Sequence, residues 1–143
     1  MRLTSSTGTF EFKIIGYSPE DADWRDRNSL LCELSTVSNQ EKHTQETPIR
    51  TWELNRLLEN LQKIANQSSS HLTLNFSEPG LSMELVALPA EQYHLQVQLD
   101  HDLTPSWHPY NDFPCQLEIT LSRQQLQEAI HDLARQLEAY PER

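Results

Sequence analysis

His71–Leu99 reads HLTLNFSEPGLSMELVALPAEQYHLQVQL, and within it apolar and polar residues alternate in three successive runs. A period of two places apolar side chains on one face of an extended chain and polar side chains on the other. Pro79 and Gly80 separate the first two runs and favour a turn, because Pro presets φ and Gly accepts a positive φ. Parallel strands buried on both faces read as continuous apolar runs instead, so the pattern predicts an antiparallel or mixed sheet with one solvated face.

The same alternation recurs on either side of this stretch. Further runs carry apolar residues at alternate positions: Phe10, Phe12 and Ile14; Leu30, Cys32 and Leu34; Cys115, Leu117, Ile119 and Leu121. We therefore predict six strands in one mainly antiparallel sheet. By contrast, Ser38–Thr47 holds ten residues without an apolar side chain. We expect a mobile loop there, because the segment has nothing to bury.

Two segments change to the helical period. From Thr51 and from Ser122 onward, apolar residues recur at spacings of three and four, which places them on one side of a helix. Thr51 can cap the first helix, while Ser122 and Gln125 fit a capping box for the second. Pro141 ends the second helix. The sequence thus predicts a single α+β domain over residues 1–143, in the order ββαββββα, with two helices packed on one face of a six-stranded sheet.

The chain is acidic, with 21 Asp and Glu against 11 Lys and Arg and a formal net charge of −10. This charge repels phosphate backbones and anionic membranes and attracts basic surfaces. We therefore expect a basic protein partner and no direct contact with nucleic acid or membrane, although acidity for solubility alone fits equally well. The sequence starts without the apolar core of a secretory signal and has no apolar run long enough to cross a bilayer, which predicts a cytoplasmic protein.

The sequence carries no motif for catalysis or for cofactor binding. Nucleophile elbows, phosphate-binding glycine loops, paired Cys-x-x-Cys ligands and His-Glu-x-x-His helices are all missing. Cys32 and Cys115 fall on the apolar faces of strands, which predicts buried, reduced thiols. Asp100-His101-Asp102, with His108 nearby, comes closest to a metal cluster, but adjacent strand residues point to opposite faces. We therefore predict no enzyme, no metal site and no cofactor.

Two connections combine aromatic side chains with carboxylates. Leu103–Pro114 has three prolines and three aromatic residues, and Glu20–Arg27 has four carboxylates around a tryptophan. Rigid aromatic side chains beside acidic ones suit a contact with a basic protein. The partner-binding candidates are Asp21, Asp23, Trp24, Asp26, Asp102, Trp107, Tyr110 and Asp112. The alternative is structural: Trp107 and Phe113 fold back as a lid on the core, and Trp24 plugs the edge of the sheet.

Four stretches, spread over nearly the whole chain, resemble the WapI-type family of bacterial immunity proteins. They are Ile14-Ile15-Gly16-Tyr17; Thr51-Trp52-Glu53-Leu54 followed by Leu57 and Leu61; Phe76-Ser77-Glu78-Pro79-Gly80-Leu81-Ser82-Met83; and Tyr140-Pro141-Glu142-Arg143. The resemblance implies a small cytosolic protein that protects a cell against the toxic C-terminal domain of a contact-delivered polymorphic toxin.

The mechanism implied by this resemblance agrees with the charge of the chain. Many such toxins cleave nucleic acids and need basic clefts, which an acidic protein can occlude after electrostatically steered association. The inhibition would be stoichiometric. The alternative from another class is an acidic adaptor or regulatory module, whose solvated sheet face binds a peptide or a protein of the same cell.

Overall fold

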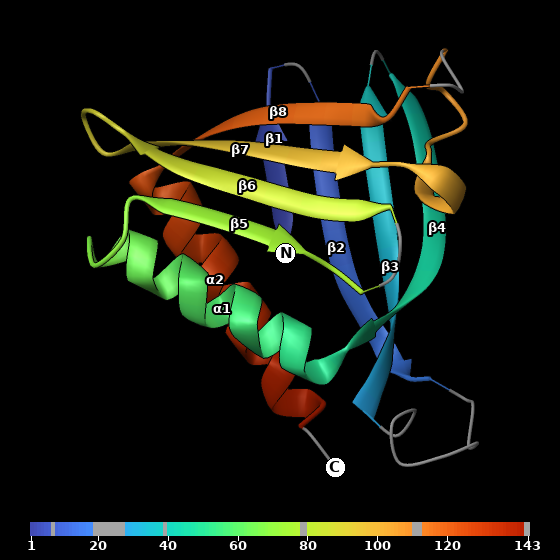
Figure 1. Ribbon diagram of the computed structural model, residues 1–143, viewed down its shortest axis with the longest axis horizontal. Coiled ribbons are helices and arrows are strands. Elements are labelled where there is room, and N and C mark those ends of the chain that lie inside the picture. The colour runs from blue at the N-terminus through green and yellow to red at the C-terminus, as the bar shows by residue number, and fades with distance from the viewer. Residues whose placement is uncertain (7, 19–27, 39, 78–79, 110–112, 142–143) are drawn as a thin grey trace.

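The computed structural model in Figure 1 describes residues 1–6, 8–18, 28–38, 40–77, 80–109 and 113–141. These residues form two four-stranded antiparallel sheets, each followed by one helix. The first half contains β1 (Arg2–Ser5), β2 (Gly8–Tyr17), β3 (Ser29–Ser38), β4 (Glu41–Arg50) and α1 (Thr51–Ala65). The second half contains β5 (His71–Asn75), β6 (Leu81–Leu88), β7 (Gln92–Leu99), β8 (Cys115–Ser122) and α2 (Arg123–Ala139).

The predicted α+β fold with two helices and antiparallel strands is confirmed, but the prediction of one six-stranded sheet in the order ββαββββα is wrong. All six predicted strands form, yet β2 and β3 belong to one sheet and β5–β8 to the other, and the order is ββββαββββα. The strands of the two sheets cross at a steep angle in Figure 1. Alternation shows which side chains of a strand face inward, but it looks the same in both sheets and does not show which strands pair.

The segment Ser38–Thr47, predicted as a mobile loop, lies largely in β4. β4 pairs with β3 over its whole length, and Gln40 between the two strands has a φ of 68°. Polar side chains of β4 meet the connection between β7 and β8: Gln45 Nε2 donates to the Leu103 carbonyl at 2.7 Å, and His43 Nδ1 lies 3.1 Å from Ser106 Oγ. β4 is largely exposed over residues 41–46 and its side-chain contacts there are polar, so it shows no apolar period and the sequence pattern missed it.

Both helices lie side by side along one side of the β5–β8 sheet (Figure 1). Their predicted apolar stripes are buried, including Leu57 and Leu61 of α1 and Leu126 and Ala129 of α2. These four side chains surround a void of about 20 Å³ together with apolar residues of β1 and of the β5–β8 sheet. Full burial of a leucine side chain contributes about 1.5–3 kcal/mol, so this layer is a main source of stability. Neither helix in the described part of the chain is both long and apolar enough to span a membrane.

The two helix starts differ in how they are capped. Ser122 and Gln125 form the predicted capping box, with Ser122 Oγ accepting from Gln125 N at 3.2 Å and Gln125 Oε1 accepting from Ser122 N at 2.9 Å. Thr51, predicted as a cap, is instead the first residue of α1, and its hydroxyl donates to the Asn28 carbonyl at 2.9 Å. Glu53 accepts from the main-chain N–H of Arg50 at 3.2 Å, which ties down the start of α1.

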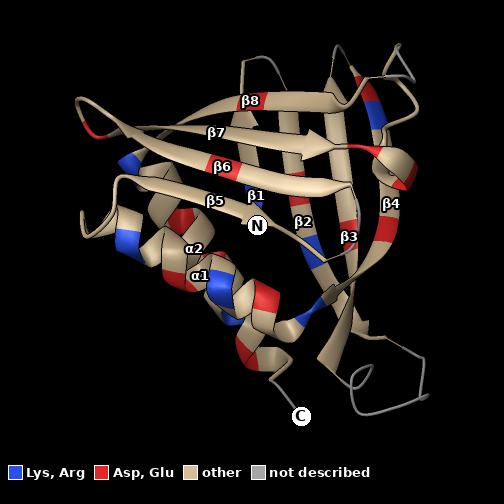
Figure 2. Cartoon of the chain, viewed as in Figure 1, with Lys and Arg blue, Asp and Glu red and all other residues tan. Residues whose placement is uncertain are grey.

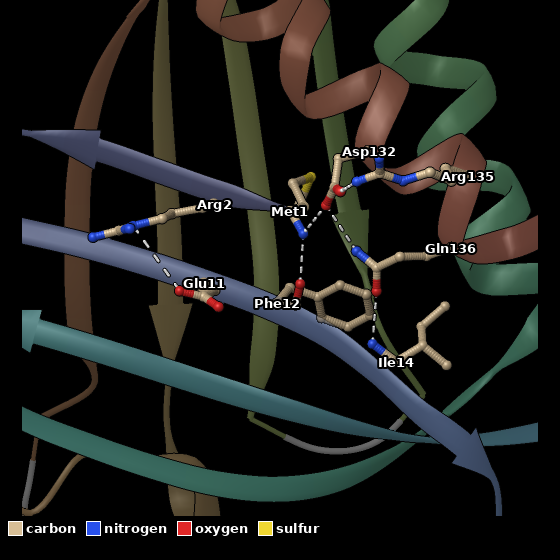
Figure 3. A network of polar contacts seen from close by, with 8 residues as sticks. All are labelled: Met1, Arg2, Glu11, Phe12, Ile14, Asp132, Arg135 and Gln136. Carbon is tan, nitrogen blue, oxygen red and sulfur yellow. Dashed lines mark hydrogen bonds and ion pairs between the residues drawn. The ribbon is translucent and has the colours of Figure 1, made fainter.

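A polar network joins the first strand to the last helix (Figure 3). The ammonium group of Met1 forms an ion pair with Asp132 of α2 and donates to the Phe12 carbonyl at 2.6 Å. Gln136 bridges onward, because its Nε2 donates to Asp132 at 2.9 Å and its Oε1 accepts from Ile14 N at 2.7 Å. These contacts fix α2 against β1 and β2.

Candidate protein interface

A groove of about 700 Å³ runs beside β8, between the outer sides of the two sheets. One wall comes from β8 and from His94 of β7, and the other from the first turn of the chain, the end of β3 and the connection between β7 and β8. Its described lining residues are Thr4, Ser5, Ser6, Gly8, Ser38, His94, Trp107, His108, Cys115, Gln116, Leu117, Glu118, Ile119, Thr120 and Gln125. The groove therefore brings a solvated sheet face and a predicted aromatic segment together.

Trp107 is the predicted partner-binding residue that lines this groove. Its indole packs against the core and its Nε1 donates to Thr36 Oγ1 of β3 at 3.1 Å. The structural alternative, in which Trp107 and Phe113 fold back on the core, is therefore confirmed for Trp107. Phe113 does not fold back, because 66% of its surface is exposed. The indole holds the connection against β3 and at the same time forms part of the groove wall.

Asp102 lies away from the groove. It belongs to the short 3₁₀ helix η2 (His101–Leu103), where its side chain is exposed while Leu103 is buried. Asp100 and His101 border a separate hollow of about 230 Å³ beside Gly80. Gly80 has the predicted positive φ, of 106°, and its main chain lies too close to the Asp100 carbonyl for any side chain. The structure thus does not bring Asp102 and Trp107 into one site.

Six of the predicted partner-binding residues lie outside the described part of the chain. These residues are Asp21, Asp23, Trp24, Asp26, Tyr110 and Asp112. Of the eight predicted partner-binding residues, the structure therefore describes Asp102 and Trp107.

The solvated face of the β5–β8 sheet is acidic. Glu84 on β6 lies 3.6 Å from His71 on β5, and Glu118 on β8 lies 4.0 Å from His94 on β7. None of the four strands contains Lys or Arg, which Figure 2 shows as an absence of blue along their ribbons. The Lys and Arg residues that the structure describes lie in both helices and in the first sheet. Sequence reasoning did not select Glu118 or His94, although the missing Lys and Arg in these strands is a signal that could have pointed to them.

Among the described residues, no three His, Cys, Asp or Glu side chains are grouped so that they could hold a metal ion. Cys32 and Cys115 are free and buried, as predicted. Burial raises the pKa of the Cys32 thiol to about 12 and also raises the pKa of Cys115, so both thiols are protonated near neutral pH.

One solved structure has a fold similar to that of this chain, and one family model matches its sequence. A chain in a solved structure described as "Structure of a guideRNA-binding protein complex bound to a gRNA" superposes with a TM-score of 0.50 and 10% sequence identity, over 90% of this chain and 89% of that one. Identity that low shows a similar fold alone. No curated protein matches the sequence at a significant level. The model of the family described as "Immunity protein WapI-like family" matches residues 2–141, nearly the whole chain. This chain therefore belongs to the WapI-like family of immunity proteins.

Proposed function

We propose that this protein binds the toxic C-terminal domain of a polymorphic toxin and neutralises it stoichiometrically, by occluding the surface that the toxin needs. Membership of the WapI-like family supports a role in toxin immunity. The observation that carries the proposal of occlusion is the groove beside β8, which holds Glu118 and has no Lys or Arg among its described lining residues. A groove of that charge favours a basic partner surface.

A protein partner fits these observations better than a nucleic acid. The structurally similar chain comes from a guide RNA-binding complex, but a phosphate backbone is bound through Lys and Arg. The strands β5–β8 have neither, and the chain carries a net charge of −10. We propose the cytoplasm as the compartment, where two free cysteines remain reduced.

The proposed docking contacts come from the groove and from residues of the two acidic connections that are not part of its described lining. Trp107 contributes from the groove wall, and Asp102 from η2. The remaining contributors are proposed on their residue types: Asp21, Asp23, Trp24, Asp26, Tyr110 and Asp112. Carboxylates around aromatic side chains would pair with Lys or Arg of the toxin, while the aromatic rings exclude water from these contacts.

Co-expression with the toxin domain encoded beside this gene tests the proposal. We expect the pair to co-purify as a stoichiometric complex and the host to survive a toxin that kills it when expressed alone. No complex and no protection would contradict toxin immunity. Protection without a complex would contradict occlusion.

A charge-matched pair of variants tests where the toxin binds. The triple change Asp21→Asn, Asp23→Asn and Asp26→Asn removes three negative charges from the proposed surface. The control change Glu59→Gln, Glu128→Gln and Glu138→Gln removes three exposed negative charges from the helices. We expect slower association, measured by stopped-flow mixing, in the first variant and a much smaller change in the second. Equal effects would contradict a role for these three aspartates.

A further inference from the structure

The outer strands of the two sheets are β1, β4, β5 and β8. Three of them, β1, β4 and β5, have features that hinder pairing with a strand of another chain. β1 and β5 are short, with four and five residues. β4 is long, but it carries Lys42 and Pro48 and is partly covered by the connection that contains Leu103. Short strands, lysine, proline and a covering loop are the ways in which proteins prevent the edges of sheets from pairing with another chain.

β8 is the exception among these outer strands. It has eight residues, its sequence CQLEITLS contains no Lys, Arg or Pro, and it pairs within the described chain only with β7. The groove of about 700 Å³ follows its outer side from Cys115 to Thr120, and residues of β1 and of the turn after it line the opposite wall. In Figure 1, β8 forms the upper border of its sheet. The longer of the two edges of the β5–β8 sheet thus borders this groove.

The register of the sheet shows which main-chain groups of β8 face this groove. Asp100 N donates to the Gly80 carbonyl at 2.8 Å, so even-numbered residues of β7 direct their main-chain groups toward β6. Odd-numbered residues of β7 then face β8, where they pair with odd-numbered residues. The residues of β8 whose N–H and C=O groups point away from β7 are therefore Gln116, Glu118 and Thr120.

A second contact leads to the same assignment. Ser122 has the same parity as these residues, and its N–H donates to Gln125 Oε1 at 2.9 Å rather than to its neighbour on β7. Apart from the ladder with β7, neither Gln116 nor Thr120 has a main-chain hydrogen bond to the part of the chain that the structure describes. The outward main-chain groups of Gln116 and Thr120 are therefore positioned to accept another strand.

We propose that an extended, basic segment of the toxin adds to β8 as a fifth strand of the β5–β8 sheet; this inference rests on the proposed function. A Lys or Arg of that segment lies opposite Glu118, the one charged residue of β8. A second copy of this chain fits less well. Two copies would bring net charges of −10 together, and an antiparallel register centred on Glu118 would set that carboxylate opposite its own copy.

The test uses this protein and a toxin domain encoded beside its gene. Thr120→Pro removes an outward N–H, whereas Thr73→Pro makes the same change on β5, at the opposite edge of the same sheet. Thr73 pairs with Glu84 while Ser70 and Phe76 make the hydrogen bonds to β6, so its N–H also points outward. A proline at either site spares the ladder, because proline is tolerated where the N–H faces away from the neighbouring strand. We expect Thr120→Pro to weaken toxin binding about tenfold or more and Thr73→Pro to leave it unchanged.

Amide hydrogen exchange on the wild-type complex gives a readout that does not depend on a variant. We expect toxin binding to slow exchange of the Gln116 and Thr120 amides and to leave Thr73 unaffected. If the wild-type protein binds no toxin, both the function and the strand addition are wrong. If it binds, but Thr120→Pro binds as tightly and both amides exchange as in the free protein, strand addition alone is wrong. Slow exchange of both amides in a free protein that dimerises would assign the edge to a second copy and overturn the proposal.

Discussion

Asp132 on α2 accepts hydrogen bonds from three groups at once. The ammonium group of Met1 has the largest effect, and with Arg135 and Gln136 it lowers the pKa of the Asp132 carboxyl from its usual range to about 2, against the opposing effect of burial. A carboxyl with a lowered pKa in the folded state stabilises the protein fully above its unfolded-state pKa, near 4. That contribution is lost as the pH falls from about 4 to about 2.

We predict that Asp132→Asn lowers the free energy of unfolding at pH 7 by about 1–2 kcal/mol, an amount reduced by the partial exposure of the carboxylate. Urea titrations from pH 7 to pH 2 measure the effect. The difference between variant and wild type should shrink as the pH falls from about 4 to about 2, because the carboxyl is protonated first in the unfolded state and then, near pH 2, in the folded state as well. Glu138→Gln, on the exposed side of the same helix, is the control and should change stability by less than about 0.5 kcal/mol. A constant difference over the whole pH range would contradict the assigned pKa.

At the level of elements, Glu53 connects α1 to the hairpin of β5 and β6. Only 2% of the residue is exposed, and besides Arg50 N its carboxylate accepts from Ser77 N at 2.6 Å and from Ser77 Oγ at 2.8 Å. Glu53 and Ser77 come from two of the stretches on which the resemblance to the immunity proteins rests. In the structure the two stretches are in direct contact, because the Glu53 carboxylate accepts a hydrogen bond from the main-chain N–H of Ser77.

We predict that Glu53→Ala lowers the free energy of unfolding by about 2–4 kcal/mol, because it removes a buried carboxylate that accepts hydrogen bonds from Arg50 N, Ser77 N and Ser77 Oγ. Glu59→Ala, at an exposed position of the same helix, should cost less than about 0.5 kcal/mol. Urea denaturation followed by circular dichroism measures both changes. Similar losses in the two variants would mean that Glu53 contributes only helix propensity.

The elements that could be predicted are those with an apolar face. The six strands and both helices bury alternate or helically spaced apolar residues, and the sequence pattern located all of them. β1 and β4 were missed for physical reasons. β1 has four residues with one buried side chain, and polar residues of β4 contact another connection.

The candidate site was only partly predictable for a related reason. Trp107 stood out because aromatic residues and prolines cluster around it, but Glu118 looks like any polar residue on a solvated strand face. Its importance depends on β8 being an outer strand that borders a groove. Strand pairing is set by contacts distant in the sequence, and a single sequence does not display them.

At the level of the whole molecule, charge and strand pairing act on different steps of binding. The net charge of −10 acts over several ångströms and accelerates the first encounter with a basic partner. Main-chain hydrogen bonds at the edge of β8 act only at contact, so they affect dissociation. Salt screens the first effect strongly, because the Debye length falls from about 30 Å at 0.01 M to about 10 Å at 0.1 M ionic strength.

We predict that the association rate with the toxin domain falls about tenfold or more as ionic strength rises from about 0.01 M to about 0.5 M, while the dissociation rate changes much less. Stopped-flow fluorescence measures the first rate and competition with unlabelled protein the second. Thr120→Pro should show the opposite pattern, with faster dissociation and an unchanged salt dependence of association, because it removes a contact and no charge. An association rate that does not respond to salt would assign recognition to apolar side chains around Trp107 and Phe113 rather than to the acidic surface.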